Sequence, residues 1–213
     1  MSEVLSLAQD RDVAIERAAR ALRDGGMVVF PTDTVYGVGA DAFQPFATNM
    51  LFHLKGRPRS LPLPVMVSAP RQAWALTSHV PREAGELAAA FWPGALTLVL
   101  QQAPDLTWDL GETKGSVALR VPANDVAREL FSIVGPMAVT SANRTGEPTP
   151  RRAADVADRL GELVSVYLDG GEAPGDVPST IVDLTGRRPR IRREGTISRE
   201  DIERIVGARV APA

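Results

Sequence analysis

Segments with the apolar spacing of helices alternate with short apolar segments typical of strands along most of this chain. Residues 10–24 repeat apolar positions at helical spacing and end at two glycines, and residues 27–30 form an apolar segment directly after them. Helix and strand then alternate until a last helix, for which Ser198 is the expected N-cap. The other expected helices cover residues 45–54, 82–91, 124–133 and 153–160, and the other expected strands cover residues 65–67, 95–100, 116–121, 137–140, 164–168, 180–184 and 190–193.

This alternation predicts an α/β fold, in which a twisted sheet of mixed parallel and antiparallel strands is flanked by helices. Residues 1–213 contain no internal repeat, low-complexity tract or long linker, so we expect a single domain. Hydrophobic residues make up 44% of the chain but aromatic residues only 5%, so the core must consist mostly of Ala, Val, Leu and Ile.

Cysteine content and charge exclude several classes of protein. The chain has no cysteine, which rules out disulfides, thiolate metal sites and cysteine nucleophiles. Its 24 basic and 26 acidic residues nearly balance, which argues against an unselective nucleic-acid binder. The first residues lack the pattern of a signal peptide, and no run of about 18 apolar residues occurs. We therefore expect a cytoplasmic protein that does not associate with membranes.

Polar loops next to three expected strands are the candidate ligand sites, because open α/β sheets usually bind ligands at strand ends. They follow Phe30 and Thr140 and surround Ser179. The first loop offers the hydroxyls of Thr32 and Thr34 close to two glycines that allow a ligand to approach the backbone. A capped turn explains the same residues equally well.

Residues 37–42 match the dinucleotide-binding pattern G-x-G-x-x-A, but their context does not fit it. Six residues separate the first glycine from Phe30, and no acidic residue follows about 20 positions later. The P-loop and G-x-S-x-G patterns are absent. A Rossmann-type nucleotide site is therefore not expected.

Two short motifs place cations and hydrogen-bond donors in loops. Lys55 and Arg57 flank a glycine at a helix end, where both could converge on one anion, although a lysine there also interacts with the helix dipole. Ser141 and Asn143 alternate along an extended segment, as expected for donors that stabilise an anionic transition state, or else they form a local turn.

Arginine dominates the basic side chains and marks two further positions. Arg120 lies within an apolar strand, where an unpaired guanidinium is costly, so it must meet an anion or an acid. Five arginines at residues 187–193 form either a solvated edge strand or an anion-binding strand. The two histidines are isolated, and no cluster of ligands predicts a metal held by the protein.

Six segments in order, PTDTVYGVGADA, KGRP, FWPGALTLVL, VALRVP, TSANRTG and PSTIVDLTG, resemble the YrdC-like family of threonylcarbamoyl-AMP synthases. The similarity covers about residues 15–200 and implies the short form, without the C-terminal domain of the longer Sua5 relatives. Leu61 and Met66 stand where many relatives carry a lysine and a histidine, and Glu194 where many carry proline.

The resemblance implies that L-threonine, bicarbonate or CO₂, and ATP combine to give threonylcarbamoyl-AMP and pyrophosphate, by nucleotidyl transfer, for the threonylcarbamoyladenosine modification of tRNA. Mg²⁺ would arrive with ATP, and the product would pass to a tRNA threonylcarbamoyltransferase complex. By the same similarity, the site residues fall into three groups: catalytic Lys55, Arg57, Ser141 and Asn143; threonine-binding Thr32, Thr34, Arg120, Val139 and Ser179; and ATP-binding Arg57, Ser116, Ser141, Thr149 and Arg193.

Two alternatives remain open on the sequence. A non-catalytic relative could use its basic surface to bind tRNA or double-stranded RNA, and such binding could also accompany catalysis weakly. A relative with altered substrate could act on another carbamoyl adenylate.

Overall fold

A computed structural model describes residues 2–175 and 177–211. Its helices are α1 (Arg11–Arg23), α2 (Pro45–Lys55), α3 (Pro70–Trp74), α4 (Arg82–Phe91), α5 (Asp125–Val134), α6 (Ala153–Leu160) and α7 (Arg199–Val206), with a 3₁₀ turn at Gly161–Leu163. Its strands are β1 (Glu3–Ser6), β2 (Val28–Phe30), β3 (Gly37–Asp41), β4 (Val65–Met66), β5 (Leu96–Gln101), β6 (Ser116–Arg120), β7 (Met137–Ser141), β8 (Val166–Asp169), β9 (Thr180–Asp183) and β10 (Arg190–Arg193).

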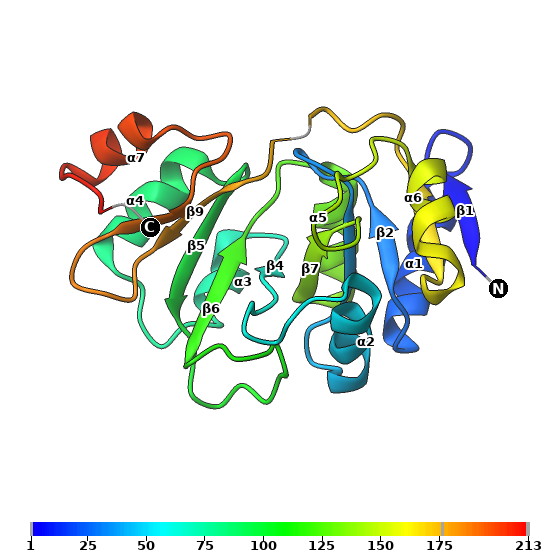
Figure 1. Cartoon of the computed structure of the whole chain (residues 1–213), viewed down its shortest axis with the longest axis horizontal. Helices are drawn as coiled ribbons and strands as arrows, with labels where there is room; N and C mark the ends of the chain where they lie inside the picture. The colour runs from blue at the N-terminus through cyan, green and yellow to red at the C-terminus, as the bar shows by residue number, and fades with distance from the viewer. Residues whose placement is uncertain (1, 176, 212–213) are drawn as a thin grey trace.

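The described strands form one twisted, mixed sheet (Figure 1) in the order β1-β8-β2-β3-β7-β4-β6-β5-β9-β10. β1, β8 and β2 are parallel, as are β4 with β6 and β5 with β9, while the other neighbours are antiparallel. Because β6 runs against β5 and β9, its carboxyl end lies beside their amino ends. This arrangement brings Arg120, at the end of β6, close to the start of β9.

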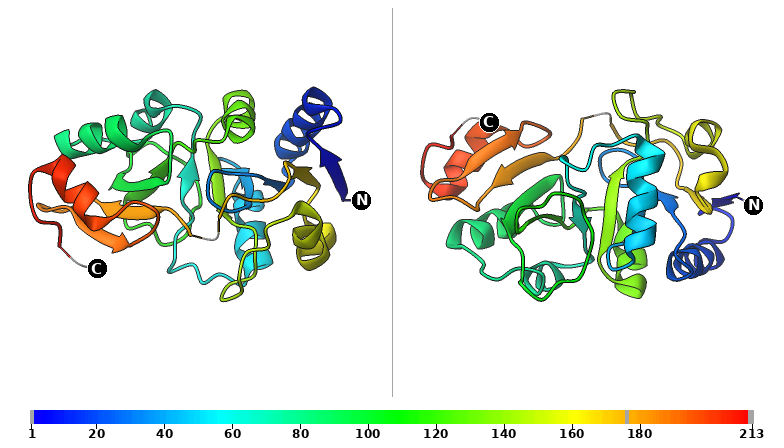
Figure 2. Two further views of the ribbon diagram at one scale, coloured as in Figure 1. Left: turned by 90° about the horizontal axis from the view of Figure 1, so that it is seen from above. Right: turned by 60° about the horizontal axis from the view of Figure 1, so that its bottom comes forward.

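Helices cover both faces of the sheet at the end formed by β1, β8, β2, β3 and β7. α1 and α5 pack together on one face, and α2 and α6 contact β3 and β8 from the other (Figure 2). Strand alternation explains this. Val28 and Phe30 of β2 belong to the core beneath α1 and α5, whereas Val29 between them belongs to the opposite core. At the other end of the sheet, α4 and α7 pack against each other.

The predicted fold class is confirmed, and most of the expected elements are present. The helix at residues 82–91 has the predicted bounds, and Asn124 and Ser198 cap α5 and α7 through their side chains. β1, α3 and β3 were not predicted from the sequence. β3 replaces the glycine-rich loop that was considered at residues 37–42, and it pairs antiparallel with β2, which is incompatible with a dinucleotide-binding turn.

None of the helices in residues 2–175 and 177–211 combines the length and hydropathy needed to cross a membrane.

Candidate active site

A cavity of about 200 Å³ lies over one face of the central strands. Alternation along β6 and β9 builds part of it, because one row of side chains enters the core and the other row faces the cavity. On β6, Leu119 belongs to the core while Ala118 and Arg120 line the cavity. On β9, Val182 belongs to the core and Ile181 lines the cavity. On β4 and β7, Met66, Val139 and Ser141 line the cavity, and Val139 also belongs to the core beneath α1 and α5.

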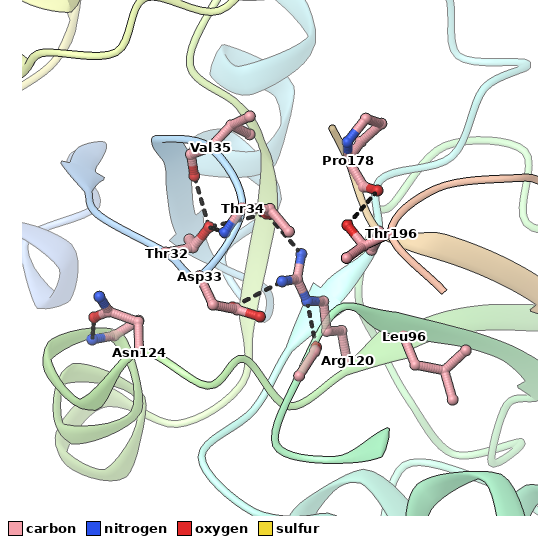
Figure 3. Close-up of polar contacts among 12 residues, drawn as sticks. Thr32, Asp33, Thr34, Val35, Leu96, Arg120, Asn124, Pro178 and Thr196 are labelled. Atoms are coloured by element: carbon pink, nitrogen blue, oxygen red, sulfur yellow. Dashed lines mark hydrogen bonds and ion pairs between the residues drawn. The ribbon is translucent and has the colours of Figure 1, made fainter. Parts of the chain in front are cut away.

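Arg120 is the most deeply buried cation of this cavity (Figure 3). Its Nη2 donates to Asp33 Oδ1 at 2.7 Å, its Nη1 to Thr34 Oγ1 at 3.2 Å, and its Nε to the carbonyl of Gly94 at 2.9 Å. Burial lowers the pKa of Arg120, and the charge of Asp33 opposes that shift. The acid that this arginine requires is therefore supplied by the protein, from the loop between β2 and β3.

That loop combines a local turn with a cavity wall, so both interpretations of its threonines apply. Thr32 Oγ1 donates to the carbonyl of Val35 at 2.6 Å, accepts from the backbone N–H of Thr34 at 3.1 Å and lies 3.1 Å from Thr34 Oγ1. Thr32 and Thr34 are buried and both line the cavity. The turn thus fixes the two hydroxyls beside the guanidinium of Arg120.

Ser179 forms the opposite wall at the amino end of β9. Its hydroxyl lies 2.8 Å from Thr97 Oγ1 and accepts a bond of 3.2 Å from Nη2 of Arg193, which also donates to the Ser179 carbonyl at 2.8 Å. Partial burial and the positive charges of Arg120 and Arg57 lower the pKa of Arg193. The guanidinium of Arg193 therefore lies at the rim of a cavity that already carries positive charge.

Arg57 brings a third guanidinium to the cavity from the segment after α2. Its Nε donates to the carbonyl of Leu61 at 2.7 Å and its Nη2 to the carbonyl of Pro62 at 3.0 Å, which leaves other donors for a ligand. Burial lowers the pKa of Arg57. Within the described residues, neither Arg57 nor Arg193 has a carboxylate within ion-pair distance. Two unneutralised guanidiniums give the cavity the chemistry that suits an anion.

Lys55 and Asn143 contact each other behind the cavity wall. Lys55 is 4% exposed, and its Nζ donates to the Ser141 carbonyl at 2.5 Å and to Asn143 Oδ1 at 2.8 Å. Burial and the positive charge of Arg57 lower the pKa of Lys55 to about 8, while Glu147 acts in the opposite direction. The motifs at residues 55–57 and 141–143 therefore meet, although Lys55 and Asn143 do not line the cavity in the described part of the chain.

The structure brings eight of the predicted site residues to the cavity lining: Thr32, Thr34, Arg57, Arg120, Val139, Ser141, Ser179 and Arg193. Ser116 faces the same side of β6 as Arg120 but lies at the far end of the strand, about 7 Å beyond Ala118. Its hydroxyl donates to the carbonyl of Thr113. Thr149 lies between β7 and α6 and does not belong to the lining among residues 2–175 and 177–211.

Sequence reasoning missed Thr97, which shapes the site, and it considered Asp33 only as a polar side chain of the loop after Phe30, without its partner Arg120. Thr97 is a single polar position inside an apolar strand, which is a detectable signal for a side chain that leaves the core. Asp33 stands between two candidate threonines, but nothing in the sequence pairs it with Arg120. Of the noted departures, Met66 lines the cavity, whereas Glu194 forms an ion pair of 2.9 Å with Arg199.

A second cavity, of about 270 Å³, lies at the opposite ends of β5 and β9. Its ionisable lining residues are His79, Glu83 and Arg187, so acid and base are mixed there. None of the predicted site residues reaches it.

The fold and the first cavity together define an α/β protein with a cation-rich ligand site on the face of a mixed sheet. The sequence profile of the Sua5/YciO/YrdC family, described as "Telomere recombination", matches residues 20–195, and the chain belongs to this family.

Relatives from several organisms support this assignment. A Mycobacterium tuberculosis protein, named provisionally as a threonylcarbamoyl-AMP synthase, is 47% identical over 213 residues, covering 99% of this chain and 98% of the relative. The threonylcarbamoyl-AMP synthase of Pyrococcus abyssi is 39% identical over 201 residues, covering 93% of this chain and 59% of the relative.

Solved structures agree with the fold. The crystal structure of P. abyssi Sua5 complexed with L-threonine matches with a TM-score of 0.92 and 36% identity, and the match covers 100% of this chain but 63% of that chain. The crystal structure of Escherichia coli YciO matches with a TM-score of 0.86 and 26% identity, over 95% of this chain and 100% of that one.

Proposed function

We propose that this protein is an L-threonylcarbamoyladenylate synthase, a nucleotidyltransferase that acts in the cytoplasm on L-threonine, bicarbonate or CO₂, and ATP. One observation carries the proposal: a single cavity is lined by the unneutralised guanidiniums of Arg57 and Arg193 and by hydroxyls around the paired guanidinium of Arg120. Such a cavity suits a triphosphate beside an amino acid.

The phosphates would bind where the positive charge is concentrated. Arg57 and Arg193 would provide bidentate donors and Ser141 a hydroxyl, all from the cavity lining. These groups are fixed by hydrogen bonds before ligand arrives, as with the bonds from Arg193 to Ser179. Preorganised donors of this kind stabilise charge that develops on phosphate oxygens in the transition state.

Threonine would bind at the hydroxyl-rich end. Arg120 uses three of its five N–H donors within the protein, so two remain for a carboxylate, and Thr34 and Ser179 offer further donors beside it. The apolar side chain of Val139 in the same wall would contact the methyl group of threonine.

The reaction would proceed in two bond-forming steps. The amine of threonine adds to CO₂ and loses a proton to give a carbamate, whose oxygen then attacks the α-phosphorus of ATP while pyrophosphate leaves. In-line displacement at phosphorus needs positioning and charge stabilisation above all. The cavity residues fit these requirements, and the lining formed by the described residues contains no carboxylate or histidine that would act as a general base.

Mg²⁺ would enter with the phosphates of ATP. Among the described residues, no group of three His, Cys, Asp or Glu side chains could hold a metal ion, and the cavity walls present cations instead. When bound to the nucleotide, Mg²⁺ would neutralise part of the phosphate charge and leave the remainder to Arg57 and Arg193.

The test is a complete reaction mixture of purified protein, ATP, Mg²⁺, labelled bicarbonate and L-threonine, from which each component is omitted in turn. The proposal requires a labelled adenylate and pyrophosphate only when every component is present. Label that appears equally with another amino acid would favour the altered-substrate relative. Absence of any adenylate in the complete mixture would contradict the proposal.

The product would pass to a tRNA threonylcarbamoyltransferase complex for tRNA modification. Weak binding of tRNA or double-stranded RNA is supported by the exposed arginines Arg187, Arg188 and Arg190 at the β9–β10 turn and on the edge strand β10. RNA binding through these residues would weaken steeply as salt concentration rises. Binding that does not respond to salt would count against this surface.

A further inference from the structure

The ammonium of Lys55 is saturated by oxygens of the protein. Lys55 ends α2, and its three N–H donors meet the Ser141 carbonyl at 2.5 Å, Asn143 Oδ1 at 2.8 Å and, more weakly, Ser141 Oγ at 3.4 Å. An ammonium has three donors and no more. Ser141 and Asn143 thus offer as many acceptors as the ammonium has donors, so within the described residues the protein itself satisfies this group.

Asn143 is saturated in the same way. Its Oδ1 accepts from Lys55, and its Nδ2 donates to the carbonyl of Arg144 at 3.0 Å and to the carbonyl of Glu147 at 2.5 Å. A lysine can only donate and two carbonyls can only accept, so the contacts themselves determine the orientation of this amide. The side chain of Asn143 is buried and its polar atoms are used inside the loop.

The backbone closes the same loop onto the end of α2. The N–H of Thr145 donates to the carbonyl of Lys55 at 3.0 Å, and the N–H of Glu147 donates to the carbonyl of Arg144 at 3.0 Å across a turn in which Gly146 has φ +87°. Residues 143–147 are thus fastened to the last residue of α2 by side chain and main chain together. Ser141, where β7 ends, is the member of this network that lines the cavity.

We propose that Lys55 and Asn143 act as one positioning unit, which fixes the loop after β7 so that Ser141 faces the bound phosphates, while Arg57, Ser141 and Arg193 make the direct contacts. This inference rests on the proposed function, because it takes the ligand of the cavity to be a polyphosphate. It differs from the expectation, drawn from the sequence, that Lys55 and Arg57 converge on the same anion.

The test compares variants for binding of inorganic pyrophosphate by calorimetry and for amide hydrogen exchange at Thr145 and Glu147. Arg57→Met removes a direct contact and should weaken pyrophosphate binding by about 10-fold or more, the usual worth of a charge-assisted hydrogen bond. Lys55→Met should weaken it by less than about 3-fold, because it removes no direct contact to the phosphates and only loosens the support of Ser141 and reduces long-range charge. Lys114→Met, which removes the other lysine of the chain at an exposed position, is the matched charge control.

Amide exchange and additivity separate positioning from direct contact. Lys55→Met and Asn143→Ala should each accelerate exchange at Thr145 and Glu147, whereas Arg57→Met should not. The double variant Lys55→Met/Asn143→Ala should lose no more adenylate-forming turnover than the worse of its two single variants, because both substitutions break the same unit. If Lys55→Met does not unfold cooperatively, Lys55→Gln, which keeps an N–H donor on the side chain, takes its place.

Three results would overturn the inference: loss of pyrophosphate binding in Lys55→Met as large as in Arg57→Met, unchanged exchange at both amides, or multiplicative losses of turnover in the double variant. A wild-type protein that binds no pyrophosphate would overturn it as well. A wild-type protein that binds pyrophosphate but forms no adenylate would instead contradict the proposed function, and binding and exchange would still decide the role of Lys55.

Discussion

Asp33 Oδ1 lies 2.7 Å from Nη2 of Arg120, and the two side chains are only 17% and 4% exposed. The pair joins the loop after β2 to the end of β6, two strands that are separated in the sheet by β3, β7 and β4. It neutralises the deepest cation of the cavity and fixes the plane of its guanidinium together with Thr34. The positive charge available to a ligand is therefore concentrated on Arg57 and Arg193.

Replacing Asp33 should destabilise the protein strongly. Asp33→Asn leaves the buried guanidinium of Arg120 without a counter-charge, and loss of one partner of a buried ion pair costs about 3 kcal/mol. The free energy of unfolding in urea measures this. The matched control is Glu3→Gln, which breaks the exposed pair with Arg17 and should cost less than about 1 kcal/mol. Equal losses in the two variants would show that the Asp33 pair is not an important part of the fold.

Removing Arg193 should weaken nucleotide binding. Arg193→Ala takes a guanidinium from the rim of the cavity, so the KM for ATP in adenylate formation should rise by about 10-fold. Arg190→Ala provides the control, since Arg190 lies on the same strand but outside the cavity lining. A KM that changes to the same extent in both variants would indicate a general effect of charge on the molecule.

The pH dependence of turnover should reveal Lys55. The ammonium donates to the oxygens of Ser141 and Asn143, whereas the neutral amine has one donor fewer and turns a lone pair toward an oxygen. Because the pKa of Lys55 is lowered to about 8, turnover should fall as pH rises through about 8. In Lys55→Arg the guanidinium stays protonated, so this limb of the profile should disappear. A pH profile that is identical in wild type and Lys55→Arg would show that deprotonation of Lys55 does not cause the fall in turnover.

The contribution of Lys55 to stability should change with pH in the opposite direction to turnover. The pKa of Lys55 falls from 10.5 to about 8 on folding, so between these pH values the unfolded chain binds the proton and the folded chain does not. The contribution of this group to the free energy of unfolding should therefore rise with pH across that window. Urea unfolding of wild type and Lys55→Met at pH 7.5 and 9.5 measures it, and the difference between the two proteins should change with pH. If this difference does not change with pH, the pKa of Lys55 in the folded protein is not lowered from 10.5.

Gly195 should not tolerate a side chain. A Cβ there would lie 2.2 Å from the carbonyl oxygen of Pro178 and 2.6 Å from the backbone nitrogen of Thr180, and neither can move without displacing the cavity wall at Ser179. Gly195→Ala should lower the free energy of unfolding by about 2 kcal/mol or more and weaken pyrophosphate binding. By contrast, Gly85→Ala on α4 has open space and should stabilise the protein by about 0.5 to 1 kcal/mol. Similar losses in both would refute the steric argument.

Helices and buried strands were predictable because their periodicity is local. β3 was not, because Gly37 and Gly39 have low strand propensity, and the reason for these glycines lies elsewhere in the chain. A Cβ at either position would lie within 3.3 Å of the Phe30 ring. β1 was missed because it pairs with β8, from the other end of the chain, and carries only a short and half-buried pattern.

The candidate site was predictable as a set of motifs, and its internal geometry was not. Motif similarity grouped Arg57, Ser141 and Arg193 from distant segments, and the cavity contains all three. It could not show that Lys55 turns toward Asn143, because that contact depends on how the loop after β7 closes. The pairing of Asp33 with Arg120 likewise depends on strand order, which motifs do not contain.

On β6 and β9, one row of side chains packs in the core and the alternate row lines the cavity. Leu119 and Val182 hold the core together, whereas Ala118 and Ile181, their direct neighbours in sequence, touch whatever occupies the cavity. Substitution of Ala118 or Ile181 alters the shape offered to a ligand without disturbing the packing of Leu119 and Val182 beneath it. A scaffold of this kind can acquire new preferences through alternate residues of the same strands, and its architecture is preserved while its chemistry diverges.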